Sequence, residues 1–348
     1  MLEWERQLKY SLTDSRALAV RFGQAFEPIE AVIQRYPMRI TPYYLDLISE
    51  PGDPVWKQAV PDKAELEDDT GEEDPLQEEK CSPLPNIVHR YPDRVLWLVS
   101  EQCSVYCRFC TRKRRVGCRR AGVAPMDDEL LRQGLKYIKG RPEVKDVILS
   151  GGDPLLLPDE QLDEILSGLR AIEHVQIIRI GSRTPCVMPL RITTRLIRVL
   201  KKYHPLYLNT HFNHPRELTA ESRQACVRLV DAGIPVGNQS VLLQGVNDNP
   251  HVMEKLLRGL LTMRVKPYYL YQADPVKGTG HFRTSIDRGL EIISYLRGNI
   301  SGLAVPSYVI DAPGGAGKII LAPDPVISRQ GKSLMLRAYD GRVCRYPA

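Results

Sequence analysis

The chain has 348 residues and a formal charge of +6, from 48 lysines and arginines against 42 aspartates and glutamates. Hydrophobic residues make up 43% and charged residues 26%, which is typical of a folded globular protein and excludes a disordered or collagen-like one. No apolar run reaches the length of a membrane span, and the start lacks the apolar core of a secretory signal. We therefore expect a cytoplasmic protein without a membrane partner.

Residues 1–60 carry apolar residues at helical spacing, interrupted by prolines, and this pattern predicts an N-terminal helical region. Residues 61–82 contain ten acidic residues against two lysines, and we expect them to form a solvated acidic linker. Because so many acids are concentrated there, the remainder of the chain is basic and suits anionic ligands.

Short β-rich runs alternate with amphipathic helical stretches from residue 95 onward. The runs are VLWLV (95–99), DVILS (146–150), VQIIRI (175–180), LYLNTHF (206–212), VGNQSVLL (236–243) and VKPYYLYQ (265–272). This alternation is that of βα units, and it predicts an α/β fold with an open, partial (βα)6 barrel over residues 83–311. A further run, VPSYVID (305–311), leads into a short C-terminal segment, residues 312–348, with a glycine-rich loop and a hairpin-like tail.

Polar residues stand at the carboxyl ends of these runs, which is where active sites form in a parallel barrel. They are Ser100, Ser150 to Asp153, Ser182, Arg183, Asn209, His211, Asn238, Gln239, Tyr271, Asp274 and Asp311. Polar groups that end apolar strands are costly unless they meet ligands or one another, so they predict a functional barrel mouth.

Three of the eight cysteines, Cys103, Cys107 and Cys110, follow the first run at spacings of four and three. Thiolates at this spacing suit an iron–sulfur cluster or zinc. A zinc knuckle needs a fourth ligand, for which Cys118 is the only local candidate. Three ligands instead leave one iron of a [4Fe–4S] cluster open to a substrate, and we prefer this interpretation to zinc or to a fully ligated electron-transfer cluster.

The CxxxCxxC motif after the first run, with GGDP after the second, resembles the radical S-adenosylmethionine (SAM) superfamily. The resemblance implies that the open iron binds the amino and carboxylate groups of SAM. It also implies that Gly151, Gly152 and Asp153 form the GGD-type element of that superfamily. The two glycines would let the backbone approach a ligand closely.

Longer segments resemble the lysine 2,3-aminomutase family from about residue 80 to about residue 338. They include HRYPDRVLWLVSEQCSVYCRFCTRKRR (89–115), GNQSVLLQGVND (237–248) and VIDAPGGAGKI (309–319). The resemblance implies three cofactors: a [4Fe–4S] cluster, SAM and pyridoxal 5′-phosphate (PLP). It implies that PLP is held covalently by Lys318, which follows a glycine-rich loop.

The same resemblance gives roles to residues around the expected barrel mouth. The positions that match PLP contacts are Arg90, Tyr91, Arg94 and Tyr271, and those that match SAM contacts are His211 and Gln239. Arg112 matches the residue that binds the substrate carboxylate, a role suited to a bidentate guanidinium. The basic run of Arg112, Lys113, Arg114, Arg115, Arg119 and Arg120 lacks interleaved aromatic residues, so we expect no nucleic-acid partner.

Asp274 and Asp311 match the two aspartates that hold the side-chain ammonium of lysine in the family. Two carboxylates around one buried cation balance its charge, whereas an anionic side chain would be repelled. In glutamate-specific relatives these positions are not both acidic, so the resemblance favours L-lysine. The alternative for Asp311, which precedes Ala-Pro, is a helix cap or turn.

The resemblance as a whole implies an isomerase that interconverts L-lysine and β-lysine by 1,2-amino migration through a 5′-deoxyadenosyl radical. It also implies a reducing electron donor such as flavodoxin or ferredoxin. Alternatives are the same reaction on arginine or glutamate, a relative that forms (R)-β-lysine for elongation factor P, a radical enzyme without PLP, and a non-catalytic electron carrier. Because Asn249 follows GVND and Cys344 is the only cysteine near the end, we expect no C-terminal structural zinc site, and a homo-oligomer stays possible.

Overall fold

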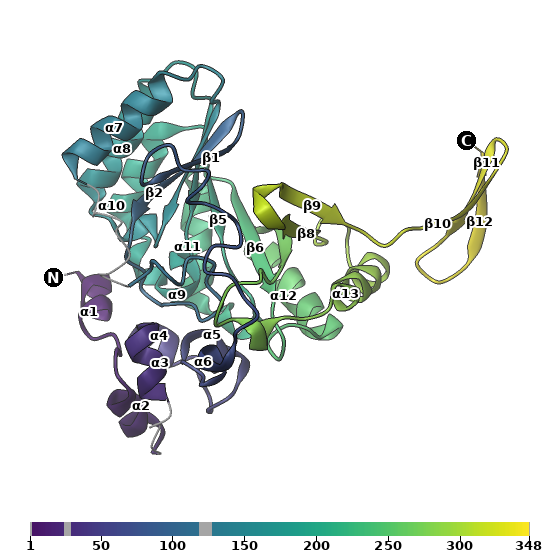
Figure 1. The fold of residues 1–348 in the computed structure, drawn as a ribbon, viewed down its shortest axis with the longest axis horizontal. Coiled ribbons are helices and arrows are strands. Elements are labelled where there is room, and N and C mark those ends of the chain that lie inside the picture. Colours follow the sequence, from purple (N-terminus) through teal and green to yellow (C-terminus); the bar gives the residue numbers. More distant parts are fainter. Residues whose placement is uncertain (1, 24–28, 118–126, 348) are drawn as a thin grey trace.

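The computed structural model describes residues 2–23, 29–117 and 127–347, and its centre is a curved nine-stranded sheet (Figure 1). The strands are β1 (Ile87–Tyr91), β2 (Arg94–Ser100), β3 (Asp146–Gly151), β4 (Ile177–Gly181), β5 (Leu206–Thr210), β6 (Val236–Leu242), β7 (Lys266–Gln272), β8 (Ser307–Ala312) and β9 (Gly317–Leu321). They pair in sequence order, parallel from β2 to β8 and antiparallel at both edges. No ladder in the described residues joins β1 to β9, so the barrel is open, as expected. The six strands predicted for the barrel are β2 to β7, and β8 is a seventh parallel strand.

Helices connect the parallel strands and cover the outer face of the sheet (Figure 1). They are α7 (Asp128–Lys139), α8 (Asp159–Arg170), α9 (Thr184–Val187), α10 (Thr194–Leu200), α11 (Ala220–Asp231), α12 (Pro250–Thr262) and α13 (Ile286–Asn299). Short 3₁₀ helices are η2 (Pro154–Leu156), η3 (Pro189–Arg191), η4 (Lys201–Tyr203), η5 (Pro215–Glu217), η6 (Gly280–Phe282) and η7 (Pro313–Gly315). Helix α8 buries Leu162, Ile165, Leu166 and Leu169, a stripe at helical spacing. Each such side chain contributes about 1.5–3 kcal/mol by leaving water.

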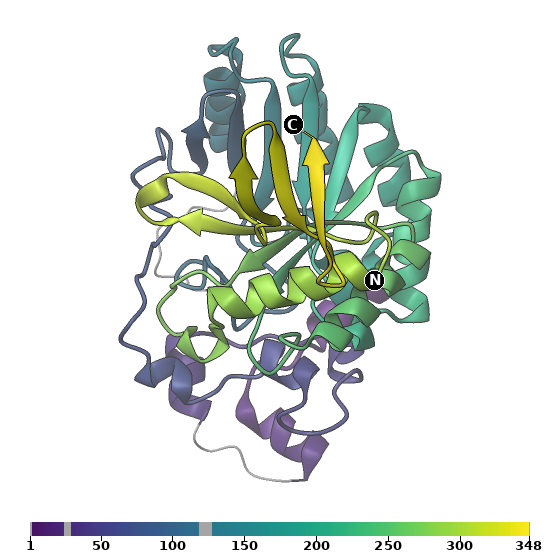
Figure 2. The same cartoon turned by 90° about the vertical axis from the view of Figure 1, so that its right-hand side faces the viewer.

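The N-terminal region is helical, as predicted. Its helices are α1 (Glu3–Lys9), α2 (Ser15–Phe22), α3 (Glu30–Arg35), α4 (Pro42–Leu45), α5 (Pro54–Ala59) and α6 (Ala64–Glu67). Helices α2–α6 lie at one end of the barrel, at the bottom of Figures 1 and 2. The amides of Tyr106 and Arg108 donate to the carbonyls of Arg39 and Gln58, so this is the end that carries the cysteine loop. Leu18 belongs to the same buried cluster as Trp97 of β2.

The acidic segment after α5 is only partly solvated, which corrects that part of the sequence interpretation. Glu65 and Glu78 have side chains 0% and 4% exposed and pair with the basic run after the cysteines. Asp74 and Glu79 pair with Arg114. The composition of the segment alone predicts exposure to solvent. In the folded chain, however, arginines of the cysteine loop neutralise several of these acids.

The C-terminal segment ends in a separate antiparallel sheet of β10 (Val326–Gln330), β11 (Ser333–Arg337) and β12 (Val343–Pro347). β11 and β12 form the hairpin expected from the sequence. The sheet projects away from the barrel in Figure 1 and stands in front of it in Figure 2. Among the described residues, no helix has the length and apolar character that a bilayer crossing requires.

Candidate active site

The three predicted cluster cysteines lie on the loop after β2 and face one cavity. Cys103, Cys107 and Cys110 line it together with Tyr36 and Lys113. Burial raises the pKa of the Cys103 thiol well above its ordinary value and that of Cys110 to about 11. Protonated thiols held together in this way release their protons when they bind a metal. The donor set therefore fits an iron–sulfur cluster.

The zinc alternative gains no support from the geometry. Among residues 2–23, 29–117 and 127–347, no three histidine, cysteine, aspartate or glutamate side chains are grouped as ligands of a single metal ion. In a [4Fe–4S] cluster each thiolate binds a different iron, so the thiols need only face a common cavity. Cys118, Arg119 and Arg120 lie outside the described residues.

A buried ion cluster holds the cysteine loop in place. Glu65 accepts from Arg108 Nε at 2.9 Å and from Lys113 Nζ at 2.5 Å. Burial opposes the charge of Glu65, but the two cations outweigh it and lower the pKa of that carboxyl. Burial also lowers the pKa of Lys113 to about 8. The sequence interpretation missed this cluster because Glu65 belongs to the acidic segment.

The Gly-Gly-Asp turn packs against the start of the cysteine loop. Gly151 has φ +124°, and a Cβ there would lie 2.2 Å from the Ser100 carbonyl oxygen. A Cβ on Gly152 would lie 2.4 Å from the carbonyl oxygen of Gln102. The sequence predicts that these glycines let the backbone approach a ligand, whereas in the structure they let it approach this loop. Both glycines also line a pocket with Arg112.

Asp153 is buried, and its carboxylate ties the end of β3 to the end of β4. It accepts from Ser182 Oγ at 2.6 Å and from the amides of Arg183 and Thr184 at 2.9 and 3.0 Å. Burial raises the pKa of this carboxyl despite those bonds. The Asp153 carboxylate therefore holds the segments that follow β3 and β4 together at the barrel mouth.

His211 follows β5, and one of its ring nitrogens is buried and unpaired in the described residues. Its Nε2 atom has no hydrogen-bond partner among the described residues. Burial lowers the pKa of the ring to about 3, so the imidazole is neutral. Its ring packs 5.5 Å from that of Phe109 in the cysteine loop. A buried polar atom without a partner in the described residues, on a ring that packs against the cysteine loop, fits the SAM contact predicted for this residue.

Gln239 and Tyr271 meet in the barrel interior. Gln239 lies within β6, and its Nε2 donates to the Tyr271 hydroxyl on β7 at 3.2 Å. Burial and the nearby charge of Asp311 raise the pKa of Tyr271 well above its ordinary value. Tyr271 also lies under the Lys318 ammonium, 5.1 Å from ring centroid to Nζ. One predicted SAM contact therefore adjoins the predicted PLP residues.

Lys318 and Asp311 form an ion pair across the β8–β9 ladder. They are directly opposite in register, and Lys318 Nζ donates to both carboxylate oxygens at 2.9 and 2.8 Å. The lysine is the second residue of β9, so it lies on a strand and not on the glycine-rich loop that precedes it. Its amide donates to the Tyr91 hydroxyl at 2.9 Å. The Asp311 carboxylate therefore binds Lys318 and does not cap a helix or close a turn.

Arg90 and Arg94 bring positive charge to the same corner. Arg90 Nη1 lies 3.9 Å from Asp311, and its Nε is buried without a partner in the described residues. Arg94 stacks over the Tyr91 ring at 4.1 Å. A guanidinium N–H without a partner in the described residues, near the Lys318–Asp311 pair, fits an anionic group such as the PLP phosphate.

Asp274 follows β7 and completes a pair of carboxylates. Burial and the charge of Asp311 raise its pKa to about 7, against the opposing effects of Lys318 and Arg90. Glu78 also raises it, so Asp274 lies within electrostatic range of that carboxylate. The structure thus brings Lys318, Asp311, Asp274 and Arg90 together.

Glu78 binds one edge of the Arg112 guanidinium. Its Nε and Nη2 donate to Glu78 at 3.0 and 2.6 Å, while Nη1 lies 3.4 Å from Ser150 Oγ at the end of β3. The second edge therefore faces the strand ends. Glu78 was not predicted, because it too lies in the acidic segment.

An open parallel barrel that carries three clustered cysteines after its first parallel strand and a Gly-Gly-Asp turn after the next defines the radical SAM class of enzymes. Residues 97–257 match the sequence profile of the radical SAM superfamily. Members of this superfamily carry a [4Fe–4S] cluster and use SAM.

Residues 293–348 match a second profile, described as lysine-2,3-aminomutase. The L-lysine 2,3-aminomutase of Acetoanaerobium sticklandii is 53% identical over 323 residues, which cover 92% of this chain and 77% of that one. The chain belongs to the lysine 2,3-aminomutase family of isomerases.

Two further matches are of different kinds. The glutamate 2,3-aminomutase of Clostridioides difficile is 45% identical over 92% of this chain and 75% of that protein. Among solved structures, a radical SAM methyltransferase from Sphaerobacter thermophilus aligns with 65% of this chain and 68% of that chain, at 19% identity and a TM-score of 0.45.

Proposed function

We propose that the protein interconverts L-lysine and β-lysine by moving the amino group between C2 and C3. Family membership supports the reaction type, but a glutamate-specific relative at 45% identity means that the substrate must be argued from the site. The observation that carries the proposal is the carboxylate pair Asp274 and Asp311. Asp274 also lies within electrostatic range of Glu78, the carboxylate that binds Arg112.

The carboxylate pair is built for a cation. In the structure Asp311 already binds one, the ammonium of Lys318. When Lys318 carries PLP, its nitrogen is committed to the cofactor, and the negative charge of Asp311 becomes available. The ammonium of a lysine substrate then restores the balance, whereas a glutamate side chain would add a third negative charge.

Arg112 supplies recognition at the other end of the substrate. Because Glu78 holds the Nε–Nη2 edge, the guanidinium cannot rotate freely, and its Nη1 is directed to the end of β3. We assign this second edge to the substrate carboxylate, which matches a guanidinium in geometry and charge.

The PLP and SAM sites complete the arrangement. Lys318 would hold PLP, with Arg90 Nε and Tyr91 beside its phosphate, and His211 Nε2 would contact SAM near the cluster thiols. Together the cofactors supply a 5′-deoxyadenosyl radical and a site that stabilises the radical during nitrogen migration. The protein binds and orients the groups and excludes water. A low-potential donor such as flavodoxin or ferredoxin would reduce the cluster.

The test is an anaerobic assay of reconstituted, dithionite-reduced protein with PLP, SAM and L-lysine, followed by mass spectrometry of the products. We expect β-lysine from the wild type and none from Cys107→Ala or Lys318→Ala. Borohydride reduction of the PLP-loaded protein should add the mass of the cofactor to the peptide that contains Lys318. Cleavage of SAM without β-lysine would contradict the proposed substrate, and an unmodified Lys318 would contradict the PLP assignment.

A further inference from the structure

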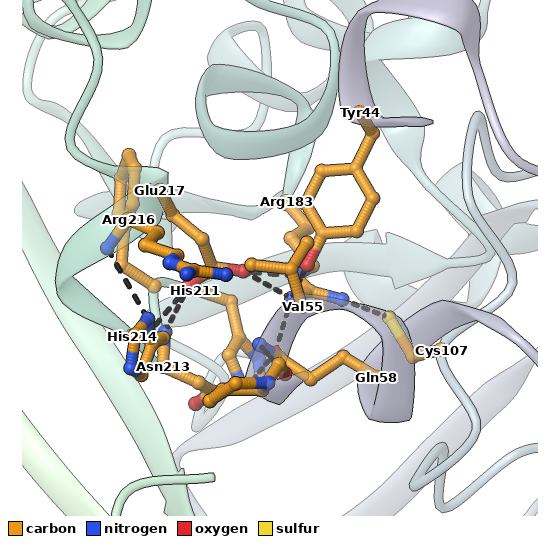
Figure 3. A network of polar contacts seen from close by, with 12 residues as sticks. Tyr44, Val55, Gln58, Cys107, Arg183, His211, Asn213, His214, Arg216 and Glu217 are labelled. Carbon is orange, nitrogen blue, oxygen red and sulfur yellow. Dashed lines mark hydrogen bonds and ion pairs between the residues drawn. The ribbon is translucent and has the colours of Figure 1, made fainter. Parts of the chain in front are cut away.

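Arg183, which follows β4, is a buried arginine with no role in the proposed reaction so far. Its side chain is 9% exposed. Nη1 donates to the Sγ atom of the cluster ligand Cys107 at 2.7 Å, and Nε donates to the carbonyl of His211 at 3.2 Å (Figure 3). One guanidinium therefore connects a cluster thiol with the residue expected to contact SAM.

The remaining nitrogen of Arg183 is fixed by three partners. Nη2 donates to Gln58 Oε1 at 2.7 Å, to Glu217 Oε1 at 2.8 Å and to the Tyr44 hydroxyl at 3.1 Å (Figure 3). Tyr44 and Gln58 belong to the N-terminal helices α4 and α5. The orientation of the guanidinium is thus set jointly by the N-terminal helices and by the segment that follows β5.

Charge is balanced within this network. A buried cation costs several kcal/mol unless it is paired. Glu217, whose side chain is 0% exposed, supplies the counter-charge, and its second oxygen accepts from the amides of Asn213 and His214 at 2.6 and 2.8 Å. The carboxylate lies on one side of the guanidinium and the Cys107 sulfur on the other, so positive charge is directed at the thiol.

We propose that Arg183 is a positioning residue for the iron–sulfur cluster, which fixes the Cys107 thiolate and raises the reduction potential of the cluster. Hydrogen bonds and positive charge at a ligating sulfur stabilise the additional electron of the reduced state. Glu217 opposes this effect through its own charge. The proposal rests on the cluster assignment and does not depend on which amino acid is the substrate.

The test is a redox titration of the reconstituted cluster, followed by electron paramagnetic resonance, without SAM, PLP or amino acid. Arg183→Gln keeps a hydrogen-bond donor but removes the charge, and we expect its midpoint potential to become more negative. Glu217→Gln removes the opposing charge, and we expect a more positive potential. Tyr44→Phe removes a contact to both residues without changing the charge, and it should leave the potential where it is.

Opposite shifts separate an electrostatic role from a structural one, because loss of packing alone would lower iron content in both variants without moving the potentials apart. Unchanged potentials at full iron content, or shifts in the same direction, would overturn the proposal. If Arg183→Gln does not fold, Arg183→Lys should stay near the wild-type potential while Glu217→Gln rises above it, and no rise would equally overturn it. A protein that forms no β-lysine would still show these shifts.

Discussion

At the scale of residues, the ionisation of Asp274 should make binding of a cationic substrate depend on pH. Because burial and Asp311 raise its pKa to about 7, the carboxyl of the free protein is neutral below that pH and ionised above it. A cationic side chain is bound by the ionised form, so kcat/KM for L-lysine should rise with pH through about 7. Asp274→Asn should abolish this rise and raise KM at least about thirtyfold, from a loss of about 2–5 kcal/mol. A pH profile with the same rise in both proteins would contradict the assignment.

The same carboxyl should lower the stability of the free protein at neutral pH. Its folded pKa of about 7 lies above the ordinary 3.8, so the folded state binds more protons between these values. The contribution of Asp274 to the free energy of unfolding therefore falls as pH rises from about 4 to about 7. Asp274→Asn should unfold at a higher temperature than wild type at pH 8, without ligands. The exposed Asp69→Asn variant is the control and should not differ from wild type.

At the scale of elements, the end of β3 determines where the cysteine loop begins. Gly151→Ala places a Cβ in a left-handed conformation and 2.2 Å from the carbonyl oxygen of Ser100. We expect a loss of about 1–3 kcal/mol from backbone strain alone, and incomplete cluster assembly. Iron content and thermal unfolding measure both effects. Gly302→Ala, where no atom lies near the added Cβ, is the matched control. Full cluster content in Gly151→Ala would show that this contact is dispensable.

Strands could be predicted from the sequence, while their long-range contacts could not. Apolar runs such as 146–150 and 206–212 coincide with β3 and β5, because alternation with amphipathic helices is a local signal. The glycines before Lys318 indicate a loop, whereas the position of Lys318 opposite Asp311 depends on the β8–β9 ladder. Arg183 and Cys107 are 76 positions apart, and no local pattern marks them as neighbours.

At the scale of the whole molecule, the acidic segment and the cysteine loop fold as one unit. Glu65 is fully buried between Arg108 and Lys113. Glu65→Gln would leave the buried charges of Arg108 and Lys113 without their shared counter-charge, and we expect it to destabilise the protein by about 3–5 kcal/mol in chemical denaturation. Glu67→Gln, two residues further along and exposed, should have little effect. Equal midpoints for the two variants would mean that the buried cluster does not stabilise the fold.

The central claim is that two carboxylates select a cationic amino acid, and competition between substrates tests it most directly. The reconstituted enzyme is given L-lysine, L-arginine and L-glutamate together at equal concentration, and the β-amino acids are identified by mass spectrometry. The account predicts β-lysine as the main product, formed far faster than any β-glutamate, and a loss of this preference in Asp274→Asn. Preferential formation of β-glutamate, or a preference that Asp274→Asn leaves unchanged, would contradict it.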